Sequence, residues 1–369
     1  MAIEYGYAGA AKANGEIWTW GDGDHGCLGI NSITSVSSPV LVIGNHSFTD
    51  MSITTSAAVG RKSNGGGWSW GYNSGGVLGD NSITDKSSPI LIVGNHSFDG
   101  VHIATQTCGW KSNNELWMWG INAFGQLGTG NRISYSSPVL VIGNHSFVRG
   151  NNGGDSSYSL KTNGEAWSWG SNSNGRLGNG DAVSYSSPVA VIGNHNFIRM
   201  TARGNPYFLK SNGQIWSWGN NSGGQLGDGT TTDKSSPVAV IGDHSFVKLG
   251  VGGLSALKAN QELWVWGDGA YGGLGNNTTT AVSSPVTIVG NHSFIEVIRA
   301  SGSHSHGLKA NGEIWSWGRN SEGQLGDGSK TDRSSPVLVV GNHSFYTLET
   351  YEAMGFTATY SHLPMHYRV

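Results

Sequence analysis

A unit of about fifty residues recurs seven times along this 369-residue chain. The most regular marker of the unit is the second tryptophan of a Trp-x-Trp-Gly motif, at Trp20, Trp70, Trp119, Trp169, Trp218, Trp266 and Trp317. Successive markers are separated by 50, 49, 50, 49, 48 and 51 residues. Because these units fill almost the whole chain, they leave no room for an inserted domain, and the fold must be an array of similar modules.

Each unit is expected to form short β-strands. In residues 313–328, Ile-Trp-Ser-Trp alternates with the period of a strand, so both tryptophans leave the same face. A glycine-rich loop follows, and Ser-Ser-Pro then opens an apolar strand, where proline is tolerated at a strand start or an edge. An Asn-Gly pair before the tryptophans signals a hairpin, and a further strand follows Asn-His-Ser-Phe. We therefore expect four short strands in each unit.

The two ends of the chain distinguish a ring from an open array. The first unit begins without Asn-His-Ser-Phe, whereas residues 346–351 resemble a first strand that no later strand completes. Pairing them would close a ring without exposed sheet edges, whereas an open solenoid is expected to have distinct caps. We predict an all-β, seven-bladed β-propeller of four-stranded blades over residues 1–351, closed by the C-terminal strand completing blade one. Residues 352–369 form an aromatic tail.

The loop motif Trp-Gly-x-Asn-x-x-Gly-Gln-Leu-Gly resembles the RCC1 repeat. It is complete at residues 119–128, 218–227 and 317–326, while Val77 and Arg176 replace its glutamine and two blades carry Asp-Gly for x-Asn. The resemblance covers roughly residues 1–350 and implies a seven-bladed RCC1-like propeller. Members of the family include a nucleotide exchange factor for a small GTPase on chromatin and secreted bacterial β-lactamase inhibitors. The resemblance therefore implies a fold and leaves the function open.

Composition excludes several classes of partner. The formal net charge is −3, only 12% of residues are charged and no basic run occurs, so nothing favours nucleic acid or an anionic membrane. No apolar run reaches transmembrane length, and residues 1–5 lack the features of a signal peptide. We expect no membrane insertion, and either a cytoplasmic protein or one that reaches a particle or cell surface by a non-classical route. Cys27 and Cys108 lie in different repeats and indicate no disulfide framework.

The recurrent aromatic residues have structural and functional interpretations. Fourteen paired tryptophans could stack on sugars, but their recurrence in every blade favours packing between blades, with roughly 150–250 Å² buried by each side chain. The histidine of each Asn-His-Ser-Phe turn could join a metal ring. No cysteine or carboxylate accompanies these histidines, so we expect them to hold their turns, without metal or cofactor. No nucleophile, base and orienting group recur together, which indicates a non-enzymatic protein.

Two segments vary from blade to blade. The first precedes the recurrent lysine of the second strand and contains Gln106, Trp110, Tyr158, Asn205, Tyr207, His304 and His306. The second lies in the glycine-rich loop and contains His25, Phe124, Arg176, Tyr271 and Glu322. Variable positions on a rigid frame usually carry binding specificity, so these residues are our candidate binding surface. Neutral drift explains the same variation, and both interpretations stay open at this point.

Three functions are compatible with these features. The favoured one is a binding or structural platform on a particle or cell surface, a virion included, which contacts a protein partner or neighbouring copies. A second is a regulator of a protein partner, similar to an exchange factor or an enzyme inhibitor. No inserted wedge or basic tail supports the exchange factor, and no signal peptide supports the inhibitor. A third is a glycan-binding lectin, which requires Phe124, Tyr207 and Tyr271 to lie exposed on one face.

The closure model makes a prediction about two truncations. Deleting residues 353–369 is expected to leave the melting temperature unchanged, whereas deleting residues 346–369 is expected to lower it sharply. The longer deletion removes the strand that we expect to cover the open edge of blade one. Thermal unfolding followed by circular dichroism measures both effects. If both truncated proteins melt at the full-length temperature, the closure model is wrong.

Overall fold

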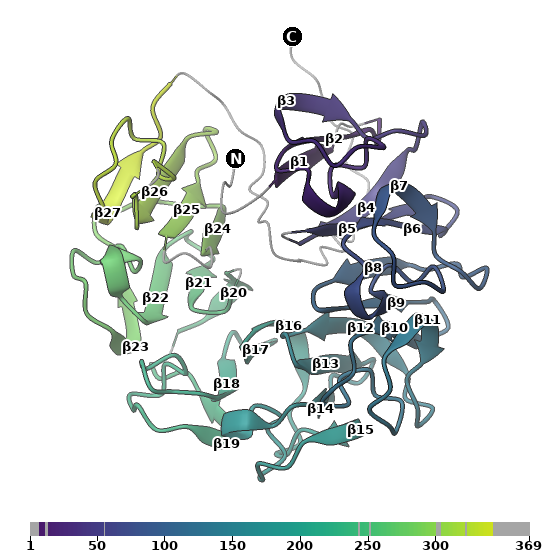
Figure 1. Ribbon diagram of the computed structural model, residues 1–369. Helices are drawn as coiled ribbons and strands as arrows, with labels where there is room; N and C mark the ends of the chain where they lie inside the picture. The colour runs from purple at the N-terminus through teal and green to yellow at the C-terminus, as the bar shows by residue number, and fades with distance from the viewer. Residues whose placement is uncertain are drawn as a thin grey trace.

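The computed structural model describes residues 7–11, 14–54, 56–242, 244–250, 252–299, 304–321 and 323–341. These residues form seven antiparallel sheets that lie around a ring (Figure 1). Six of the sheets have four strands, and the sheet of blade one has three within the described residues. The all-β, seven-bladed propeller is therefore confirmed. The expected closing strand, residues 346–351, and the tail, residues 352–369, lie outside the described part of the chain.

In each blade, consecutive strands are neighbours, and they run from the centre of the ring to its rim (Figure 1). The strands of blades one to three are β1 (Tyr7–Ala11), β2 (Ile17–Gly21), β3 (Val36–Leu41), β4 (Phe48–Ile53), β5 (Ala57–Lys62), β6 (Gly67–Gly71), β7 (Lys86–Leu91), β8 (Gly100–Ile103), β9 (Gln106–Trp110), β10 (Leu116–Gly120) and β11 (Tyr135–Leu140). Those of blades four and five are β12 (Phe147–Asn152), β13 (Ser156–Lys161), β14 (Ala166–Gly170), β15 (Tyr185–Ala190), β16 (Phe197–Arg203), β17 (Asn205–Lys210), β18 (Ile215–Gly219) and β19 (Lys234–Ala239). Those of blades six and seven are β20 (Phe246–Leu249), β21 (Ser255–Lys258), β22 (Leu263–Gly267), β23 (Val282–Thr287), β24 (Glu296–Arg299), β25 (His304–Leu308), β26 (Ile314–Gly318) and β27 (Arg333–Leu338).

Helical structure within the described residues is limited to 3-10 turns in the glycine-rich loops. These turns are η1 (Asp24–Gly26), η2 (Ser74–Gly76), η3 (Ser173–Gly175) and η4 (Ala270–Gly272). None of the helices found in these ranges has the length and apolar character that a membrane span requires.

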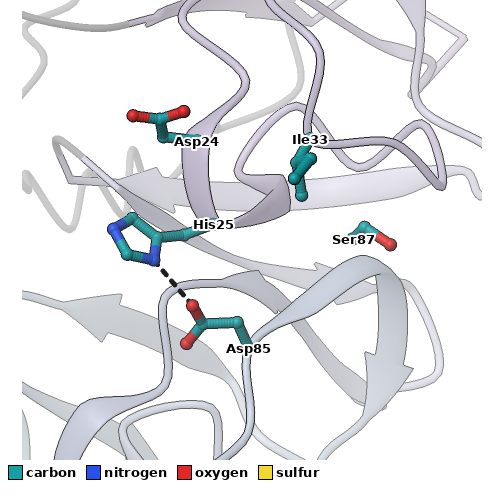
Figure 2. Close-up of a pocket in the computed structure, with 5 residues that line it drawn as sticks. All are labelled: Asp24, His25, Ile33, Asp85 and Ser87. Carbon is teal, nitrogen blue, oxygen red and sulfur yellow. Dashed lines mark hydrogen bonds and ion pairs between the residues drawn. The ribbon is translucent and has the colours of Figure 1, made fainter.

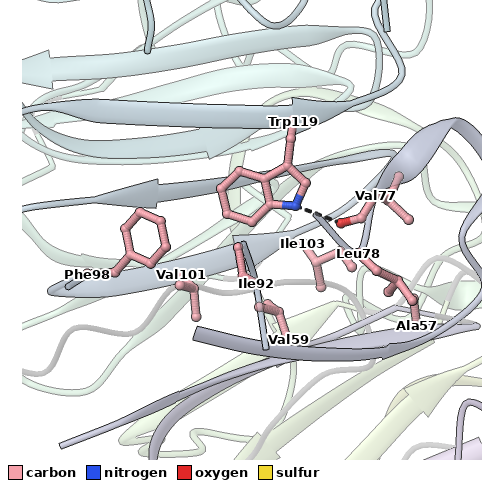
Figure 3. Packing of buried hydrophobic residues seen from close by; sticks show 9 residues of the cluster. All are labelled: Ala57, Val59, Val77, Leu78, Ile92, Phe98, Val101, Ile103 and Trp119. Carbon is pink, nitrogen blue, oxygen red and sulfur yellow. Dashed lines mark hydrogen bonds between the residues drawn. The ribbon is translucent and has the colours of Figure 1, made fainter. Parts of the chain in front are cut away.

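The second tryptophan of each pair joins neighbouring blades. Six of these side chains, from Trp70 to Trp317, are fully buried, whereas Trp20 of blade one is half-buried. Trp119 of blade three packs among residues of blades two and three, and its Nε1 donates a hydrogen bond of 2.9 Å to the carbonyl oxygen of Val77 in blade two (Figure 3). The hydrophobic core therefore lies largely between blades, in a series of similar clusters.

Close approach to the indole explains a glycine of the loop motif. Gly79 has a φ of +69°, and a Cβ atom at this position would lie 2.6 Å from Nε1 of Trp119. Gly178 stands in the same relation to Trp218, with a corresponding separation of 2.5 Å. Any larger residue would push the loop away from the tryptophan, so the Leu-Gly pair and the tryptophan of the next blade are required together.

We expect Trp169→Ala to lower the free energy of unfolding by about 3–5 kcal/mol, because it removes a large, fully buried side chain from an interblade cluster. Phe124→Ala, at a position that is 41% exposed, is the matched control and should cost less than about 1 kcal/mol. Equilibrium unfolding in urea measures both changes. Equal, small effects would contradict an interblade role for Trp169.

Candidate functional site

Strand order gives each end of the propeller a different set of connections. In a four-stranded antiparallel blade, the loop between the third and fourth strands and the loop between the first and second strands lie at the same end. We call this end the loop face; it carries the glycine-rich loops, such as residues 72–85. The opposite end, the turn face, carries the Asn-Gly turns and the turns that contain His46, His96, His145, His195, His244 and His292.

A buried asparagine fixes the shape of most glycine-rich loops. In blade two, Asn73 Nδ2 donates to the carbonyl oxygens of Ser82 and Thr84 at 3.2 and 3.1 Å, and Oδ1 accepts the N–H of Leu78 at 2.9 Å. The equivalent asparagines, at positions 122, 172, 221 and 320, are also buried and accept the same leucine N–H. This asparagine therefore holds the loop and is not available to a ligand.

Two blades achieve the same loop without the asparagine. Gly23 and Gly269 replace it in blades one and six. A Cβ atom on Gly23 would lie 2.5 Å from the carbonyl oxygen of Thr34, and one on Gly269 would lie 2.1 Å from that of Thr280. The returning segment of the loop thus occupies the space that the asparagine side chain fills elsewhere. The missing asparagine side chain is therefore replaced by backbone of the same loop.

In three blades, the tip of the glycine-rich loop contacts the next blade. The rings of His25 and Tyr72 lie with their centroids 4.6 Å apart. The ring centroid of Tyr271 lies 5.5 Å from the guanidinium carbon of Arg319. The side-chain amide of Asn174 donates a hydrogen bond of 2.6 Å to a carboxylate oxygen of Asp233 in blade five. His25 and Tyr271 have φ values of 59° and 58°, in the left-handed region that non-glycine residues seldom adopt. Such backbone strain is often found at functional positions.

The candidate residues of the glycine-rich loop do not all occupy the tip. Phe124 and Tyr271 are 41% and 50% exposed, His25 is also exposed, and all three lie on the loop face. Arg176 lies two residues beyond the tip residue of blade four, is partly buried and donates from Nε to the carbonyl oxygen of Ser173 at 3.0 Å. Glu322 lies outside the described residues.

A pocket of about 390 Å³ opens on the loop face between blades one and two. It is lined by Asp24, His25, Ile33, Asp85 and Ser87 (Figure 2). His25 Nδ1 lies 2.6 Å from Asp85 Oδ2, and the second oxygen of Asp85 accepts a backbone N–H at 2.8 Å. The Asp–His pair resembles two members of a hydrolase triad, but Nε2 of His25 points away from Ser87 (Figure 2). The pocket therefore presents a polar contact site and no aligned nucleophile.

The candidate residues of the second strand lie in the interior. Six of them are at most 7% exposed, namely Gln106, Trp110, Tyr158, Asn205, Tyr207 and His304, and His306 is partly buried. The second strand lies between the innermost strand and the third strand, and its side chains pack against the neighbouring blades. The expectation of an exposed binding surface on this strand is therefore wrong for these six positions.

Two of these residues pack against the next blade and hydrogen-bond to a loop of their own blade. The hydroxyl groups of Tyr158 and Tyr207 donate to the carbonyl oxygens of Arg176 and Gln225 at 3.0 and 2.9 Å. Each carbonyl also accepts the indole N–H of the next tryptophan. Because Tyr207 is buried, the three aromatic residues of the lectin hypothesis do not share an exposed face.

The rings of the turn histidines pack against tryptophan in a tilted arrangement. The ring of His145 lies 4.1 Å from that of Trp167, and Lys161 Nζ lies 4.5 Å from the same indole while forming an ion pair of 3.0 Å with Glu165. Burial and the nearby Lys161 charge lower the pKa of His145. This histidine–tryptophan contact is found in six blades. Within the described residues, no three histidine, cysteine or carboxylate side chains gather to hold a metal ion, and His343 lies outside them.

The buried thiols are similarly structural in character. Both cysteines are free and buried, and burial raises the pKa of Cys27 and of Cys108 to about 12. Thiols that remain protonated at neutral pH are poor nucleophiles and poor metal ligands.

Comparison with protein families identifies the class of this chain. The family described as "Regulator of chromosome condensation (RCC1) repeat" matches residues 14–62, 113–156, 163–204, 212–254, 260–308 and 311–346, and a second form of the same repeat matches residues 296–324. The matched segments cover more than half of the chain, so the chain belongs to the RCC1 repeat family.

Solved structures of the same fold are distant in sequence. Human WBSCR16 is 19% identical, with a TM-score of 0.71 over 89% of this chain and 94% of that one. Prp20p of Saccharomyces cerevisiae is 20% identical, with a TM-score of 0.70 over 92% of this chain and 90% of that one. At these identities the likeness shows the fold alone. No curated protein sequence matched the chain in a direct comparison.

A fully buried histidine should make the propeller sensitive to acid. His102 is 1% exposed, and burial lowers its pKa from 6.5 to about 4, so the unfolded chain binds its proton first as the pH falls. The free energy of unfolding should therefore decline between about pH 6.5 and 4, with His102 contributing up to about 1.4 kcal/mol per pH unit. His102→Gln should flatten this decline. Urea unfolding at pH 7, 6 and 5 measures the slope, and identical slopes in both proteins would contradict the assignment.

Proposed function

We propose that this protein is a non-enzymatic platform that binds a protein partner through its loop face. The observation that supports the proposal is a contrast within each glycine-rich loop. The base of the loop is held by a buried asparagine or glycine and by the indole of the next blade, while the tip differs from blade to blade. His25, Phe124 and Tyr271 are exposed at equivalent tips of a rigid frame. Variable residues on fixed loops are the usual means of specific recognition.

The strained backbone at two tips adds to this argument. His25 and Tyr271 adopt left-handed φ values, which are unfavourable for residues with a side chain. Gly75, at the equivalent position of blade two, adopts a left-handed φ without this conformational cost. A side chain retained in an unfavourable backbone conformation, at an exposed position, is consistent with selection for contact. Aromatic side chains such as Tyr271 and Phe124 contribute strongly to protein interfaces.

Relatives provide a precedent for protein partners. The structure of Prp20p was described together with its binding to Gsp1p and histones, and another structure shows Kap60 bound to yeast RCC1 (Prp20). A partner that contacts several loop tips at once fits the platform better than a glycan does, because the aromatic cluster required for a lectin is absent from the described residues.

The setting that we favour is the surface of a particle or a cell, a virion surface included. The near-verbatim Gly-, Ser- and Thr-rich repeats and the low content of charged residues support a compact module of this kind. An exchange factor or an enzyme inhibitor is the alternative. Accelerated nucleotide release from a small GTPase in the presence of this protein would favour the exchange factor over the platform.

A display selection tests the proposed surface. Random peptides displayed on phage are selected against the immobilised full chain, and the affinity of the enriched peptides is measured by biolayer interferometry. The double variant Phe124→Ser/Tyr271→Ser should bind them about tenfold more weakly, because it removes two exposed aromatic contacts.

Leu91→Ser is the matched control, since Leu91 is 50% exposed at the end of β7 nearer the turn face. It should leave the affinity unchanged. Peptides that bind the double variant as tightly as the unmodified protein would show that the loop tips are not the binding surface.

A further inference from the structure

The innermost strand begins with the same irregularity in four blades. Its pairing with the second strand shifts register between Phe48 and Asp50 in β4, and at the equivalent positions of β12, β16 and β20. One residue at the start of each strand is therefore left out of the ladder as a β-bulge. Bulges often re-aim a side chain at the rim of a sheet. Here the bulge lies on the turn face, at the opposite end from the glycine-rich loops.

The residue that the bulge exposes is aliphatic in three consecutive blades. It is Val148, Ile198 and Val247 in blades four, five and six, with exposures of 37%, 53% and 53%. Blade seven presents Ile295, 39% exposed, at the equivalent position. Blade two has Thr49 there, so the fold itself does not require an apolar residue. We call Val148, Ile198, Val247 and Ile295 the bulge arc.

The members of the bulge arc lie on adjacent strands. The innermost strands β12, β16 and β20 approach one another within 8 Å between Cα atoms. Lys248 Nζ donates to the carbonyl oxygen of Ile295 at 3.3 Å, which brings blade seven next to blade six. The four side chains therefore follow one another, one in each blade, as an apolar strip at the turn-face end of the innermost strands of blades four to seven.

A row of cations accompanies the strip. The residue after each bulge is Arg149, Arg199 and Lys248 in blades four, five and six, and Glu296 follows Ile295 in blade seven. Arg199 is exposed, and its charge adds to burial in lowering the pKa of Arg149. Nζ of Lys248 lies 3.3 Å from Oε1 of Glu296, and the two side chains form an ion pair. The row thus holds three cations and one carboxylate, in a chain whose formal net charge is −3.

We propose that the bulge arc and this row of cations form a second docking surface, for an extended acidic segment of a partner protein with alternating apolar residues. Side chains of an extended segment point alternately to opposite sides. One set would pack on Val148, Ile198 and Val247, and the carboxylates between them would turn toward Arg149 and Arg199.

The chemistry of the bulge arc and of the row of cations favours an acidic, partly apolar segment over other anions. A guanidinium group binds a carboxylate through paired hydrogen bonds, and a carboxylate near both arginines offsets the repulsion between their charges. A nucleic acid backbone would also meet the cations, but it offers nothing to cover an aliphatic strip. The surface lies on the turn face and does not depend on the loop-tip surface proposed above.

Peptides of defined sequence test the proposal. The probe is a fluorescein-labelled ten-residue peptide of alternating leucine and glutamate, measured by fluorescence anisotropy with the full chain. One matched peptide has glutamine for glutamate, and the other has serine for leucine. The unmodified protein should bind the first peptide at least about tenfold more tightly than either control.

Variants locate the binding site. Ile198→Ser/Val247→Ser should weaken binding of the leucine–glutamate peptide by about tenfold or more, and Arg199→Gln should weaken it and reduce its salt dependence. All three positions are exposed, so melting temperatures should stay unchanged and confirm that the variants fold. Phe124→Ser, on the loop face, should leave the affinity unaltered.

Three results would overturn the proposal. These are equal binding of the glutamine peptide, unchanged binding to Ile198→Ser/Val247→Ser, and displacement of the peptide by an equimolar short DNA duplex. A fourth result would also overturn it: if Phe124→Ser alone abolished binding, the peptide would occupy the loop face. In that case the second surface would be rejected and the proposed platform would stand.

Discussion

The structure depends on one repeated hydrogen bond, from the indole of a buried tryptophan to a backbone carbonyl of the preceding blade. It recurs with lengths of 2.9 to 3.1 Å at Trp70, Trp119, Trp169, Trp218, Trp266 and Trp317. Together with the packing of the indole among residues of both blades, this bond joins neighbouring blades and holds the loop that supplies the carbonyl. Each loop is thereby anchored at its base by its own asparagine or glycine and on its side by the next blade. Only the tip of the loop remains free to vary.

The fold could be predicted from the sequence because the constraint is local and repeated. The Trp-x-Trp-Gly motif, the Leu-Gly pair and the Asn-Gly turn each have a geometric cause within one blade or its neighbour. The exposure of the variable residues could not be predicted in this way. Tyr158 and Tyr207 are buried, and each fills a particular interblade space, whereas Phe124 and Tyr271 are 41% and 50% exposed, so packing constrains them less. Comparison of the repeats shows how much a position varies. The burial of the side chain then shows whether interblade packing or exposure explains the variation.

The bulge arc was absent from the sequence-based candidates, although the sequence contains a signal for it. The residue after the phenylalanine of the turn is Thr49 and Asp99 in two blades, and aliphatic from Val148 to Ile295 in the next four. An apolar residue at a position that tolerates threonine and aspartate suggests a purpose other than packing. Recognising it requires knowledge that the position is a bulge and that neighbouring strands place the side chains together. The two ends of the propeller therefore differ in chemistry: aromatic tips on one, and an aliphatic strip beside cations on the other.

The interblade hydrogen bond also has a direction. Every described blade from the second to the seventh donates an indole N–H to the blade before it. Each of these units therefore has two different surfaces, one that donates the hydrogen bond and one that accepts it. A head-to-tail interface does not by itself limit the number of units that it joins. Identical units can be added through it until the accumulated rotation brings the last unit against the first. The near-verbatim repeats keep that rotation uniform. A change in the angle at a single boundary would therefore alter more than one contact. It would determine whether seven units close into a ring or form an open spiral, whose end blades would each expose an interface without a partner.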